Sequence, residues 1–443
     1  MNKIVPPKIS VVGLGKLGLC LAACFASKGY RVLGIDINSN IVAAINAGQS
    51  PIAEKGLGEL LKRVKKRLQV TSDHRRAIGE TDITIVIVAT PSDRKDNFSN
   101  KYIETALKSL SAALKNSPKK YHLFIVSSTV MPTTINEKLI PLIEKYSNRR
   151  LNKGFGVCYI PDFVALGSVI HDFLNPDLVL IGESDKHAGS LSQKLYQSLC
   201  PVGTPVFRMS LINAEIVKMA LNTFITMKIS FANSIANICE RIPGGSVDKV
   251  CKALGADRRI SPYYLKGGLG YGGTCFPRDT GAFRALGKKF KIKTPLVEAT
   301  EEINNLQNKL LLEKVLRAAA DSGENSVTVL GMAFKPGTSV ITESPGIKLV
   351  RSLIEKRFRV YVYDPLAMEN TKSKFNSRVI YCASVAEAIA KSKLCVIATS
   401  DKIYKTIDSK LLRDNHTIID CWRILNRQKL PESTKYIPLG IHQ

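Results

Sequence analysis

The sequence predicts an α/β protein with two doubly wound parallel-sheet domains joined by a long central helix. Near each end of the chain, an apolar β-branched run leads into a glycine, a helical segment and a second apolar run that ends in Asp36 or Asp364. The segment at residues 83–91, ITIVIVATP, is apolar on both faces, as expected of a strand in a parallel sheet covered by helices on both sides. Residues 211–240 form one uninterrupted helical pattern between the two halves.

The length and composition are those of a folded protein with several domains. A chain of 443 residues is too long for one compact core, so two or three domains are expected. Hydrophobic residues make up 45% and charged residues 23%, which is ordinary for a soluble globular protein. Residues 1–10, MNKIVPPKIS, lack the apolar run of a signal peptide, and no apolar run approaches the roughly 20 residues of a membrane span. We therefore expect a cytoplasmic protein with no membrane partner.

The formal net charge of +27 favours anionic ligands. Nucleic-acid binding is one interpretation of this charge. The Lys and Arg residues, however, are spread along the chain and do not form a block interleaved with aromatic residues. A solvated basic surface with no nucleic-acid partner is therefore the favoured interpretation.

The ten cysteines include no CxxC pair and no regular spacing, which is typical of reduced thiols and not of a disulfide framework. The six histidines are scattered, with no HxxxH pair and no His/Cys cluster. We therefore expect no metal site.

The first glycine turn, at residues 13–18, reads GLGKLG. It follows an apolar run at residues 9–12, opens a helix, and precedes Asp36 at the end of the next strand, which is the context of a dinucleotide-binding, Rossmann-like unit. Its glycines allow the backbone to approach a pyrophosphate, whose charge is favoured by the helix N-terminus. Asp36 is expected to accept hydrogen bonds from the adenosine ribose and to repel a 2′-phosphate, so NAD is predicted as the cofactor in preference to NADP.

The C-terminal half resembles a degenerate repeat of the same unit. VTVLGMAFKPG is followed by a helical segment from about Pro345 to Lys356 and by FRVYVYDP, and CVIATSD at residues 395–401 parallels IVIVATPSD at residues 85–93. The second copy lacks GxGxxG and has about ten extra residues between its glycine and its helix. It should therefore bind a different ligand in a different way.

The central helix is apolar nearly all round, except for one polar stripe at helical spacing. This stripe consists of Lys218, Asn222, Thr226, Ser230, Asn233 and Asn237. It is either the solvated face of an amphipathic helix or a row of polar groups directed into a site. Because the stripe is narrow and the rest of the helix is apolar, the second interpretation is favoured.

The loop at residues 266–280, KGGLGYGGTCFPRDT, places one cysteine among glycines and cations. The residues alone make Cys275 a plausible nucleophile, because nearby cations and the backbone N–H groups of a glycine-rich loop favour a thiolate. A small apolar residue in a tight turn remains the alternative at this point.

Four motifs together resemble the nucleotide-sugar 6-dehydrogenase family: GYGGTCFPRD, STVMPTT at residues 128–134, the Lys218 and Asn222 pair, and VLGMAFKPGT. The similarity covers essentially the whole chain, and within the family the chain most resembles the members that act on UDP-glucose. The resemblance implies an NAD domain at residues 1–200, a central helical domain at residues 201–305 that forms a homodimer, and a domain at residues 306–443 that binds the nucleotide of the sugar.

The resemblance also implies a reaction. Family members oxidise carbon 6 of the sugar from a primary alcohol to a carboxylate in two hydride transfers without releasing the aldehyde. A thiolate that attacks the aldehyde gives a thiohemiacetal, and the second hydride transfer gives a thioester that water hydrolyses.

Carried over residue by residue, the resemblance assigns catalytic roles. Cys275 matches the nucleophile, Lys218 and Asn222 match the pair that stabilises the oxyanion at carbon 6, and Asp279 matches the carboxylate that works with the Lys in proton transfer. Thr129 matches the hydroxyl that positions substrate or water, and Asp162 the carboxylate that assists thioester hydrolysis. The cofactor-binding set is Gly13, Gly15, Lys16, Leu17, Gly18, Asp36, Thr90, Pro91, Thr129 and Arg278.

The substrate-binding set comprises Asp162, Lys218, Asn222, Arg259, Tyr264, Lys266, Gly272, Lys335 and Arg423. Within it, Arg259 is expected to reach across the dimer, while Tyr264 and Lys266 line the nucleotide site. Lys335 and Arg423 match residues that contact the diphosphate and the sugar, where cations suit an anionic ligand.

The chain departs from the family pattern at several positions. Asp162 stands where the motif has glutamate, Leu166 where many UDP-glucose enzymes have a second acidic residue, and Arg278 where lysine is usual. Residues 339–342, SVIT, stand where the family often has an acidic pair. Leu166 bears on sugar specificity, and Asp162 bears on thioester hydrolysis because its side chain is one methylene shorter. Arg278 keeps the charge but changes the hydrogen-bond geometry, and residues 339–342 lack an expected charge network.

Four alternatives to a UDP-glucose enzyme are considered. The nearest is a GDP-mannose 6-dehydrogenase, with the same chemistry and a different nucleotide pocket. The branch that oxidises N-acetylated UDP-sugars typically has His before the nucleophile, where this chain has Thr274. A hydroxyacid dehydrogenase would have no use for Cys275 or for the second nucleotide-binding copy. A catalytically inactive basic binding protein would not need Cys275, Lys218, Asn222 and Asp279 together.

Overall fold

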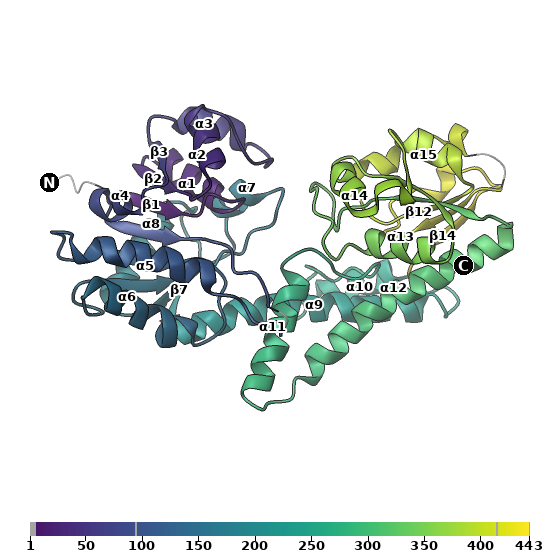
Figure 1. The fold of residues 1–443 in the computed structure, drawn as a ribbon. Helices are drawn as coiled ribbons and strands as arrows, with labels where there is room; N and C mark the ends of the chain where they lie inside the picture. Colours follow the sequence, from purple (N-terminus) through teal and green to yellow (C-terminus); the bar gives the residue numbers. More distant parts are fainter. Residues whose placement is uncertain (1–5, 94, 413–414, 443) are drawn as a thin grey trace. The chain divides into compact units, whose positions relative to one another are not determined.

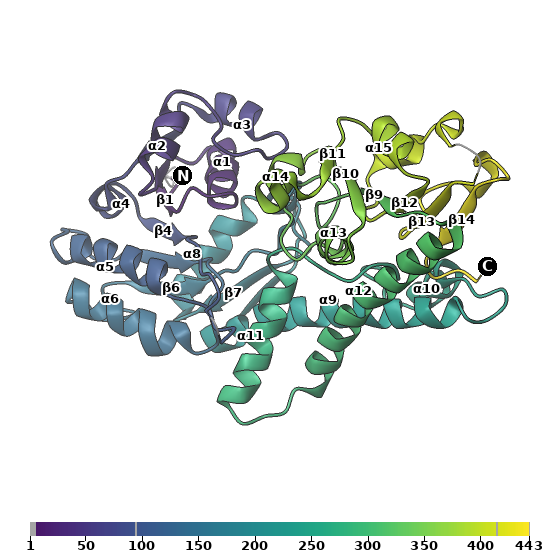
Figure 2. The same ribbon diagram turned by 45° about the vertical axis from the view of Figure 1, so that its right-hand side comes forward.

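The computed structural model describes residues 6–93, 95–412 and 415–442. The chain divides into two units, residues 1–220 and 221–443. Each unit contains one sheet with helices on both faces (Figures 1 and 2). The predicted fold class, two Rossmann-like domains with a long central helix, is therefore confirmed.

The first unit contains an eight-stranded sheet in the order β3-β2-β1-β4-β5-β6-β7-β8. In chain order the strands are β1 (Ile9–Val12), β2 (Val32–Ile35), β3 (Leu68–Thr71), β4 (Ile83–Val86), β5 (Leu123–Val126), β6 (Gly156–Tyr159), β7 (Val179–Glu183) and β8 (Val206–Ser210). The first six strands are parallel, in the order of a dinucleotide-binding fold. β7 pairs antiparallel with β6, so the last two strands extend the sheet in the opposite direction.

Helices cover both faces of this sheet because its central strands are buried on both sides. The helices are α1 (Gly18–Ser27), α2 (Ser39–Asn46), α3 (Leu57–Val64), α4 (His74–Glu80), α5 (Lys101–Lys115), the π-helix η1 (Ile135–Leu139), α6 (Ile140–Ser147), α7 (Val169–Leu174) and α8 (Lys186–Gln197). One core is formed with α1, α3, α7 and α8. The other is formed with α4, α5 and α6, and Figure 1 shows α5 and α6 side by side.

The long helix α9 (Leu211–Cys239) begins in the first unit and continues in the second. It is followed by α10 (Val247–Ala256) and by α11 (Phe276–Lys289) and α12 (Pro295–Ser322), which form a helical hairpin (Figures 1 and 2). The loop at residues 266–275 lies between α10 and α11 in the sequence, so Cys275 immediately precedes a helix.

The second sheet has six parallel strands in the order β11-β10-β9-β12-β13-β14. The strands are β9 (Ser326–Leu330), β10 (Arg359–Tyr363), β11 (Ile380–Tyr381), β12 (Leu394–Ile397), β13 (Thr417–Asp420) and β14 (Lys435–Pro438). The accompanying helices are α13 (Pro345–Glu355), α14 (Met368–Phe375) and α15 (Val385–Lys391), with 3-10 turns at Asn376–Arg378, Lys402–Thr406, Ser409–Leu411 and Arg427–Lys429. This order matches the first six strands of the first sheet, as a repeat of one unit requires.

Candidate active site

The glycine turn after β1 is shaped by one close contact. A Cβ placed on Gly18 would lie 1.8 Å from the carbonyl oxygen of Gly13, so only glycine allows α1 to start this close to the end of the strand. A Cβ on Gly15, in contrast, would meet no atom within 4 Å, and Gly15 and Lys16 are exposed. The turn therefore leaves open space beside the first residues of α1, where a pyrophosphate binds in such folds.

Asp36 stands at the carboxyl end of β2 and is half-buried. Its Oδ2 accepts a hydrogen bond from the N–H of Leu14 at 2.7 Å, and its Oδ1 accepts one from the N–H of Asn38 at 2.8 Å. A carboxylate has about four acceptor positions, so two remain for hydroxyl groups of a ribose. Asp36 therefore fits the adenosine end of a dinucleotide.

The loops after β4 and β5 are tied together. Thr90 donates its hydroxyl to the carbonyl oxygen of Thr129 at 2.7 Å, and Ser128 donates its hydroxyl to the carbonyl oxygen of Val88 at 2.7 Å. Thr129 is half-buried, and Pro91 is exposed. The structure thus brings Thr90 and Thr129 together at the carboxyl edge of the sheet, where ligands bind in open α/β folds.

Asp162 and Lys218 are neighbours within the first unit. Lys218 is 8% exposed; its Nζ donates to the backbone carbonyl of Asp162 at 2.6 Å and lies 4.8 Å from the ring centroid of Phe163. The carboxyl Oδ2 of Asp162 is buried and accepts no hydrogen bond within the described residues. Burial raises the pKa of Asp162 to about 7, although the positive charge of Lys218 opposes this. A carboxyl with such a pKa is suited to exchanging protons near neutral pH.

Glu215, one turn before Lys218 on α9, is a site residue that the sequence analysis missed. It is fully buried, and its carboxylate accepts hydrogen bonds from the N–H groups of Thr133 at 2.8 Å and Ile135 at 3.0 Å. Burial raises its pKa to about 7, while the two N–H groups lower it. Glu215 thereby anchors the STVMPTT loop that carries Thr129. A lone acidic residue in the apolar run LINAEIV was the available signal.

Cys275 is the exposed one of the ten cysteines; the others are buried or half-buried. It is the N-cap residue of α11, and its Sγ lies 3.7 Å from the hydroxyl oxygen of Thr274. A helix N-terminus stabilises negative charge, and the reactive form of a cysteine is the thiolate. Exposure and helix position thus distinguish Cys275 from the other thiols of the chain.

Asp279 lies one turn into α11 and is fully buried. Its Oδ2 accepts a hydrogen bond from the side-chain amide of Asn222 at 2.5 Å, and its Oδ1 accepts one from the Nε of Arg278 at 3.0 Å. The structure therefore brings together three of the predicted residues, Asn222, Asp279 and Arg278. In this arrangement Arg278, predicted to bind the cofactor, compensates the buried charge of its neighbour.

The segment before the glycine-rich loop is largely exposed. Arg259 forms an ion pair with Asp257 of its own chain at 2.6 Å, and its side chain is 83% exposed. Tyr264 has a φ of +60° and packs its ring edge to face against Phe276, with 6.1 Å between centroids. Lys266 is exposed. Tyr264 is thus held beside the start of α11, while Arg259 and Lys266 project to the surface.

The three remaining predicted substrate residues differ in their surroundings. A Cβ on Gly272 would lie 2.4 Å from the carbonyl oxygen of Glu343, so only glycine fits there. Lys335 is half-buried, with its Nζ 5.9 Å from the ring centroid of Phe334.

Arg423 is enclosed. Its side chain is 4% exposed, and its guanidinium pairs with both carboxylate oxygens of Asp248 at 2.8 and 3.0 Å. It also donates to the carbonyl oxygens of Leu439 and Gly267, each at 2.7 Å. Four of its five N–H groups are thus already used within the chain. This arrangement holds the start of the glycine-rich loop, and a contact of Arg423 with substrate stays a prediction.

The polar stripe of α9 is turned inward, so its interpretation as a solvated face is wrong. Asn222, Thr226, Ser230 and Asn233 are all buried. Asn222 reaches Asp279 directly, whereas Ser230 donates to the backbone of α12 at the carbonyl oxygen of Thr300. The large apolar side chains of Phe224, Phe231 and Ile238 are exposed on this helix instead. The four buried polar residues therefore serve mainly to attach the helices and loops around Cys275.

Within the described parts of the chain, no helix combines the length and the apolar character that a membrane span requires. The same residues contain no group of three or more His, Cys, Asp or Glu side chains arranged to hold a metal ion.

Three domain models of the UDP-glucose/GDP-mannose dehydrogenase family match the chain: the NAD-binding domain at residues 7–200, the central domain at residues 212–306 and the UDP-binding domain at residues 328–427. The match to the first domain identifies NAD as the cofactor.

Individual relatives agree with the domain matches. The chain is 34% identical over 427 residues to a UDP-glucose 6-dehydrogenase of Haloferax volcanii, covering 95% of this chain and 98% of the relative. It is 30% identical over 417 residues to a GDP-mannose 6-dehydrogenase of Pseudomonas aeruginosa, covering 91% and 94%. Among solved structures, a UDP-glucose dehydrogenase from Pyrobaculum islandicum gives a TM-score of 0.90 at 30% identity, covering 100% of this chain and 99% of the other.

Proposed function

The chain belongs to the UDP-glucose/GDP-mannose dehydrogenase family, and we propose that it oxidises UDP-glucose at carbon 6 to UDP-glucuronate, using NAD and a covalent intermediate on Cys275. The similarity to UDP-glucose enzymes of two archaea supports this sugar. A GDP-mannose 6-dehydrogenase remains the second candidate, because its relatives reach similar identity.

The observation that carries the proposal is the environment of Cys275. This cysteine is exposed at the N-terminus of α11, four residues before a buried Asp279 that Asn222 and Arg278 hold. A single exposed thiol at a helix start, with a carboxylate and an amide fixed one turn away, is what a nucleophilic mechanism requires. A two-electron dehydrogenase has no need of it.

In the first half of the proposed reaction, the chain stabilises charge at carbon 6. When bound, one NAD would accept a hydride in the first oxidation and a second NAD would accept one in the other. The Nζ of Lys218 and the amide of Asn222 are placed on one helix and donate to the sugar oxygen as it loses its proton and becomes an aldehyde oxygen. Asp279 takes part in transferring that proton.

In the second half, Cys275 retains the carbon. Its Sγ attacks the aldehyde carbon, so a C–S bond forms and the carbonyl oxygen becomes an oxyanion held by Lys218 and Asn222. Loss of the second hydride from this carbon leaves a thioester. The Asp162 carboxylate accepts a proton from water, which adds to the thioester carbon, so that the C–S bond breaks and the thiolate of Cys275 is restored. Thr129 positions that water.

A homodimer is part of the proposal because α9 exposes a row of large apolar side chains. Phe224, Phe231 and Ile238 recur every seven residues along α9 and are 57–59% exposed. An apolar seam with this spacing is typical of helices that pack against a second helix. In the proposed dimer, Arg259 would leave its exposed ion pair with Asp257 and contact the substrate bound to the partner subunit.

The test follows NADH formation with UDP-glucose, GDP-mannose and N-acetylated UDP-hexosamines in parallel. We expect UDP-glucose to give the highest kcat/KM, with two NADH formed per sugar. A preference for GDP-mannose would reassign the substrate, whereas a limiting yield of one NADH would contradict the thioester mechanism. Cys275→Ala should abolish uronate formation while NAD binding is retained, and unchanged turnover would show that the nucleophile is another residue.

A further inference from the structure

Asn233, on α9, makes two hydrogen bonds to the backbone of the loop that leads to Cys275. Its side chain is fully buried. Its Oδ1 accepts from the N–H of Gly268 at 2.8 Å, and its Nδ2 donates to the carbonyl oxygen of Leu269 at 3.2 Å. A side-chain amide can donate one hydrogen bond and accept another at the same time. Because the two bonds have different directions, they fix the orientation of the backbone segment.

Asn304, on α12, makes the same kind of pair two residues further along. It is 6% exposed, its Oδ1 accepts from the N–H of Tyr271 at 2.7 Å, and its Nδ2 donates to the carbonyl oxygen of the same residue at 3.2 Å. The backbone passes directly against this amide, because a Cβ on Gly270 would lie 2.5 Å from its Oδ1. Two helices thus hold residues 268–271 through four hydrogen bonds in a buried setting.

The chain after Cys275 is also held by α9. The hydroxyl oxygens of Thr226 and Thr280 are 3.2 Å apart, and Asn222 donates to Asp279. The same helix therefore holds the backbone before the cysteine and the side chains of Asp279 and Thr280 after it. Because Asn222 and Asn233 share one rigid helix, the position of the loop is set relative to the proposed oxyanion-stabilising amide.

We propose that Asn233 and Asn304 are positioning residues that hold residues 268–271 in register and thereby direct the Cys275 thiol at carbon 6 of the substrate. This inference rests on the proposed nucleophilic role of Cys275. Neither amide touches the reacting atoms; both act through the backbone. A displacement of about 1 Å at a reacting centre costs on the order of 100-fold in rate, so loss of either residue should be felt in catalysis.

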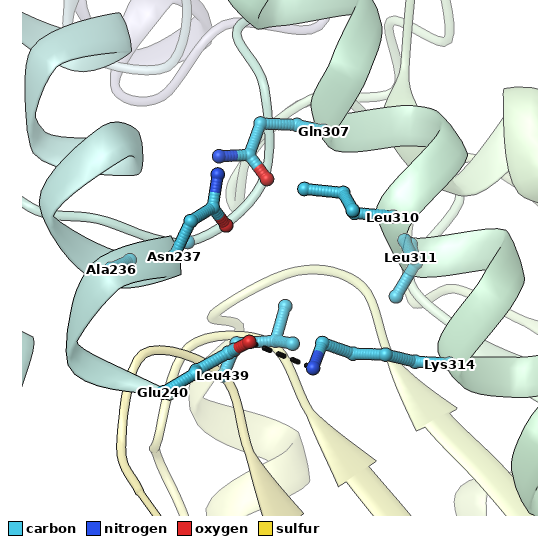
Figure 3. Close-up of a pocket in the computed structure, with 9 residues that line it drawn as sticks. Ala236, Asn237, Glu240, Gln307, Leu310, Leu311, Lys314 and Leu439 are labelled. Atoms are coloured by element: carbon cyan, nitrogen blue, oxygen red, sulfur yellow. Dashed lines mark ion pairs between the residues drawn. The ribbon is translucent and has the colours of Figure 1, made fainter. Parts of the chain in front are cut away.

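The experiment compares Asn233→Leu, Asn304→Leu and Asn304→Asp with the control Asn237→Leu in the full-length protein. Asn237 lies one turn beyond Asn233 on α9 and faces Gln307 across a small pocket that also contains the Glu240 and Lys314 ion pair (Figure 3). Thermal unfolding verifies folding. The readouts are kcat, KM for NAD, NADH formed per sugar, aldehyde trapped with hydroxylamine, and the rate of Cys275 alkylation by iodoacetamide.

For the two Leu variants we expect kcat to fall about 10- to 100-fold with KM for NAD unchanged. NADH per sugar should fall below two with aldehyde released, because a displaced thiol captures the intermediate poorly. The alkylation rate should change several-fold, while Asn237→Leu stays within about twofold of the wild type in every readout.

Asn304→Asp gives a pH signature that a general loss of stability would not. A protonated carboxyl can donate to the Tyr271 carbonyl and accept from its N–H as the amide does, whereas the ionised form cannot donate. The ratio of variant to wild-type kcat should therefore rise as the pH is lowered. A flat ratio overturns the proposal, and this variant decides the matter if the Leu variants do not fold.

Two results distinguish failure of this inference from failure of the proposed function: the NADH yield of Cys275→Ala, and the kcat, alkylation rate and NADH yield of the Leu variants. If Cys275→Ala retains two NADH per sugar, the nucleophile assignment fails, whatever the asparagine variants do. If Cys275 is the nucleophile but folded Leu variants keep wild-type kcat, wild-type alkylation rates and two NADH per sugar, the positioning role of Asn233 and Asn304 is overturned.

Discussion

The glycine turns that follow β1 and β9 share one close approach, between the last glycine of the turn and the carbonyl oxygen of the first. The two turns differ in the residues that surround this approach. In the first, a Cβ on Gly18 would lie 1.8 Å from the carbonyl oxygen of Gly13, which has a φ of +97°. In the second, a Cβ on Gly346 would lie 2.2 Å from the carbonyl oxygen of Gly331, which has a φ of +103°. The first and last glycines of the turn are thus retained, although the second pair is ten residues further apart in the sequence.

The carboxylates that follow β2 and β10 accept hydrogen bonds from different numbers of backbone N–H groups. Asp36 accepts from two backbone N–H groups and keeps capacity for a ribose. Asp364 is 3% exposed and accepts from four, which belong to Met332, Ala333, Leu366 and Ala367. The same position therefore keeps acceptor capacity in one sheet and is fully used by the fold in the other.

The ten extra residues of the second turn contribute to the proposed active site. The carbonyl oxygen of Thr342 accepts from the N–H of Gly273, and Phe334 would contact any Cβ added there, at 2.6 Å. The first turn leaves open space at Gly15. The second turn instead contains an additional segment, which contacts the loop of Cys275. One turn thus leaves open space beside its helix, and the other supports the loop that carries Cys275.

The largest expected effect comes from removing the carboxylate of the second sheet. Asp364→Ala leaves four N–H groups without their acceptor, three of them in buried residues, so we expect a loss of roughly 3 to 5 kcal/mol in the free energy of unfolding. Asp36→Ala, its counterpart, should lose about 1 kcal/mol. Denaturant unfolding of both variants measures the difference, and equal losses would contradict the contrast between the two carboxylates.

The next effect comes from adding one methyl group to equivalent glycines. Gly18→Ala and Gly346→Ala both place a Cβ against a carbonyl oxygen, and overpacking of this kind costs about 1 to 3 kcal/mol. We expect Gly18→Ala to raise KM for NAD about 10- to 100-fold with little change in KM for the nucleotide sugar. Gly346→Ala should do the reverse. Steady-state kinetics with each ligand varied in turn provides the measurement; a rise in the same KM for both variants would show that the turns do not divide the ligands.

A smaller effect concerns cofactor choice. Asp36→Ser removes the charge that repels a 2′-phosphate, so the ratio of kcat/KM for NAD to that for NADP should fall about tenfold. The matched control is Asp364→Ser, which should alter stability and leave this ratio unchanged. A ratio that is unaffected by Asp36→Ser would place the discrimination elsewhere in the turn.

These comparisons also indicate what the sequence could predict. The strand at Ile9–Val12, the long central helix and the repeat of one nucleotide-binding unit follow from apolar runs and the positions of glycines, and the structure confirms them. The two roles of Asp36 and Asp364 could not be read from the sequence, because both follow a strand in the same pattern and differ only in which N–H groups the tertiary fold brings to them.

The central helix illustrates the same limit. The narrow polar stripe favoured an inward polar side, in agreement with the buried side chains of Thr226, Ser230 and Asn233, but nothing in the sequence indicated that Phe224 and Phe231 face outward. Burial depends on partners distant in the sequence, such as the backbone of Gly268 and Leu269 for Asn233 and, in the proposed dimer, a second subunit for the apolar row. Asn304 gave no local signal at all, since a lone asparagine in a helix is ordinary.

The last contrast is between Asp162, whose buried Oδ2 accepts no hydrogen bond from the described residues, and the fully satisfied Asp364. The pKa of Asp162 is raised to about 7 in the folded chain, against about 4 for an unfolded aspartate. A raised pKa means that the folded state binds the proton more tightly, so this contribution to stability is complete below about pH 4 and is lost as the pH rises through about 7. Asp162→Asn cannot ionise and avoids that loss. We therefore expect its melting temperature to match the wild type at or below about pH 4 and to exceed it by a few degrees near pH 8.

The ionised form of Asp162 is the one that accepts a proton from water in the proposed hydrolysis, so stability and activity should oppose each other at this residue. Wild-type uronate formation should rise through about pH 7, and Asp162→Asn should be slow at every pH. Glu215 titrates in the same range because its pKa is also raised to about 7. Glu215→Gln is therefore the control. If the inflection in activity disappears in Glu215→Gln and persists in Asp162→Asn, the titrating group lies in the anchor of the STVMPTT loop and Asp162 is not the base.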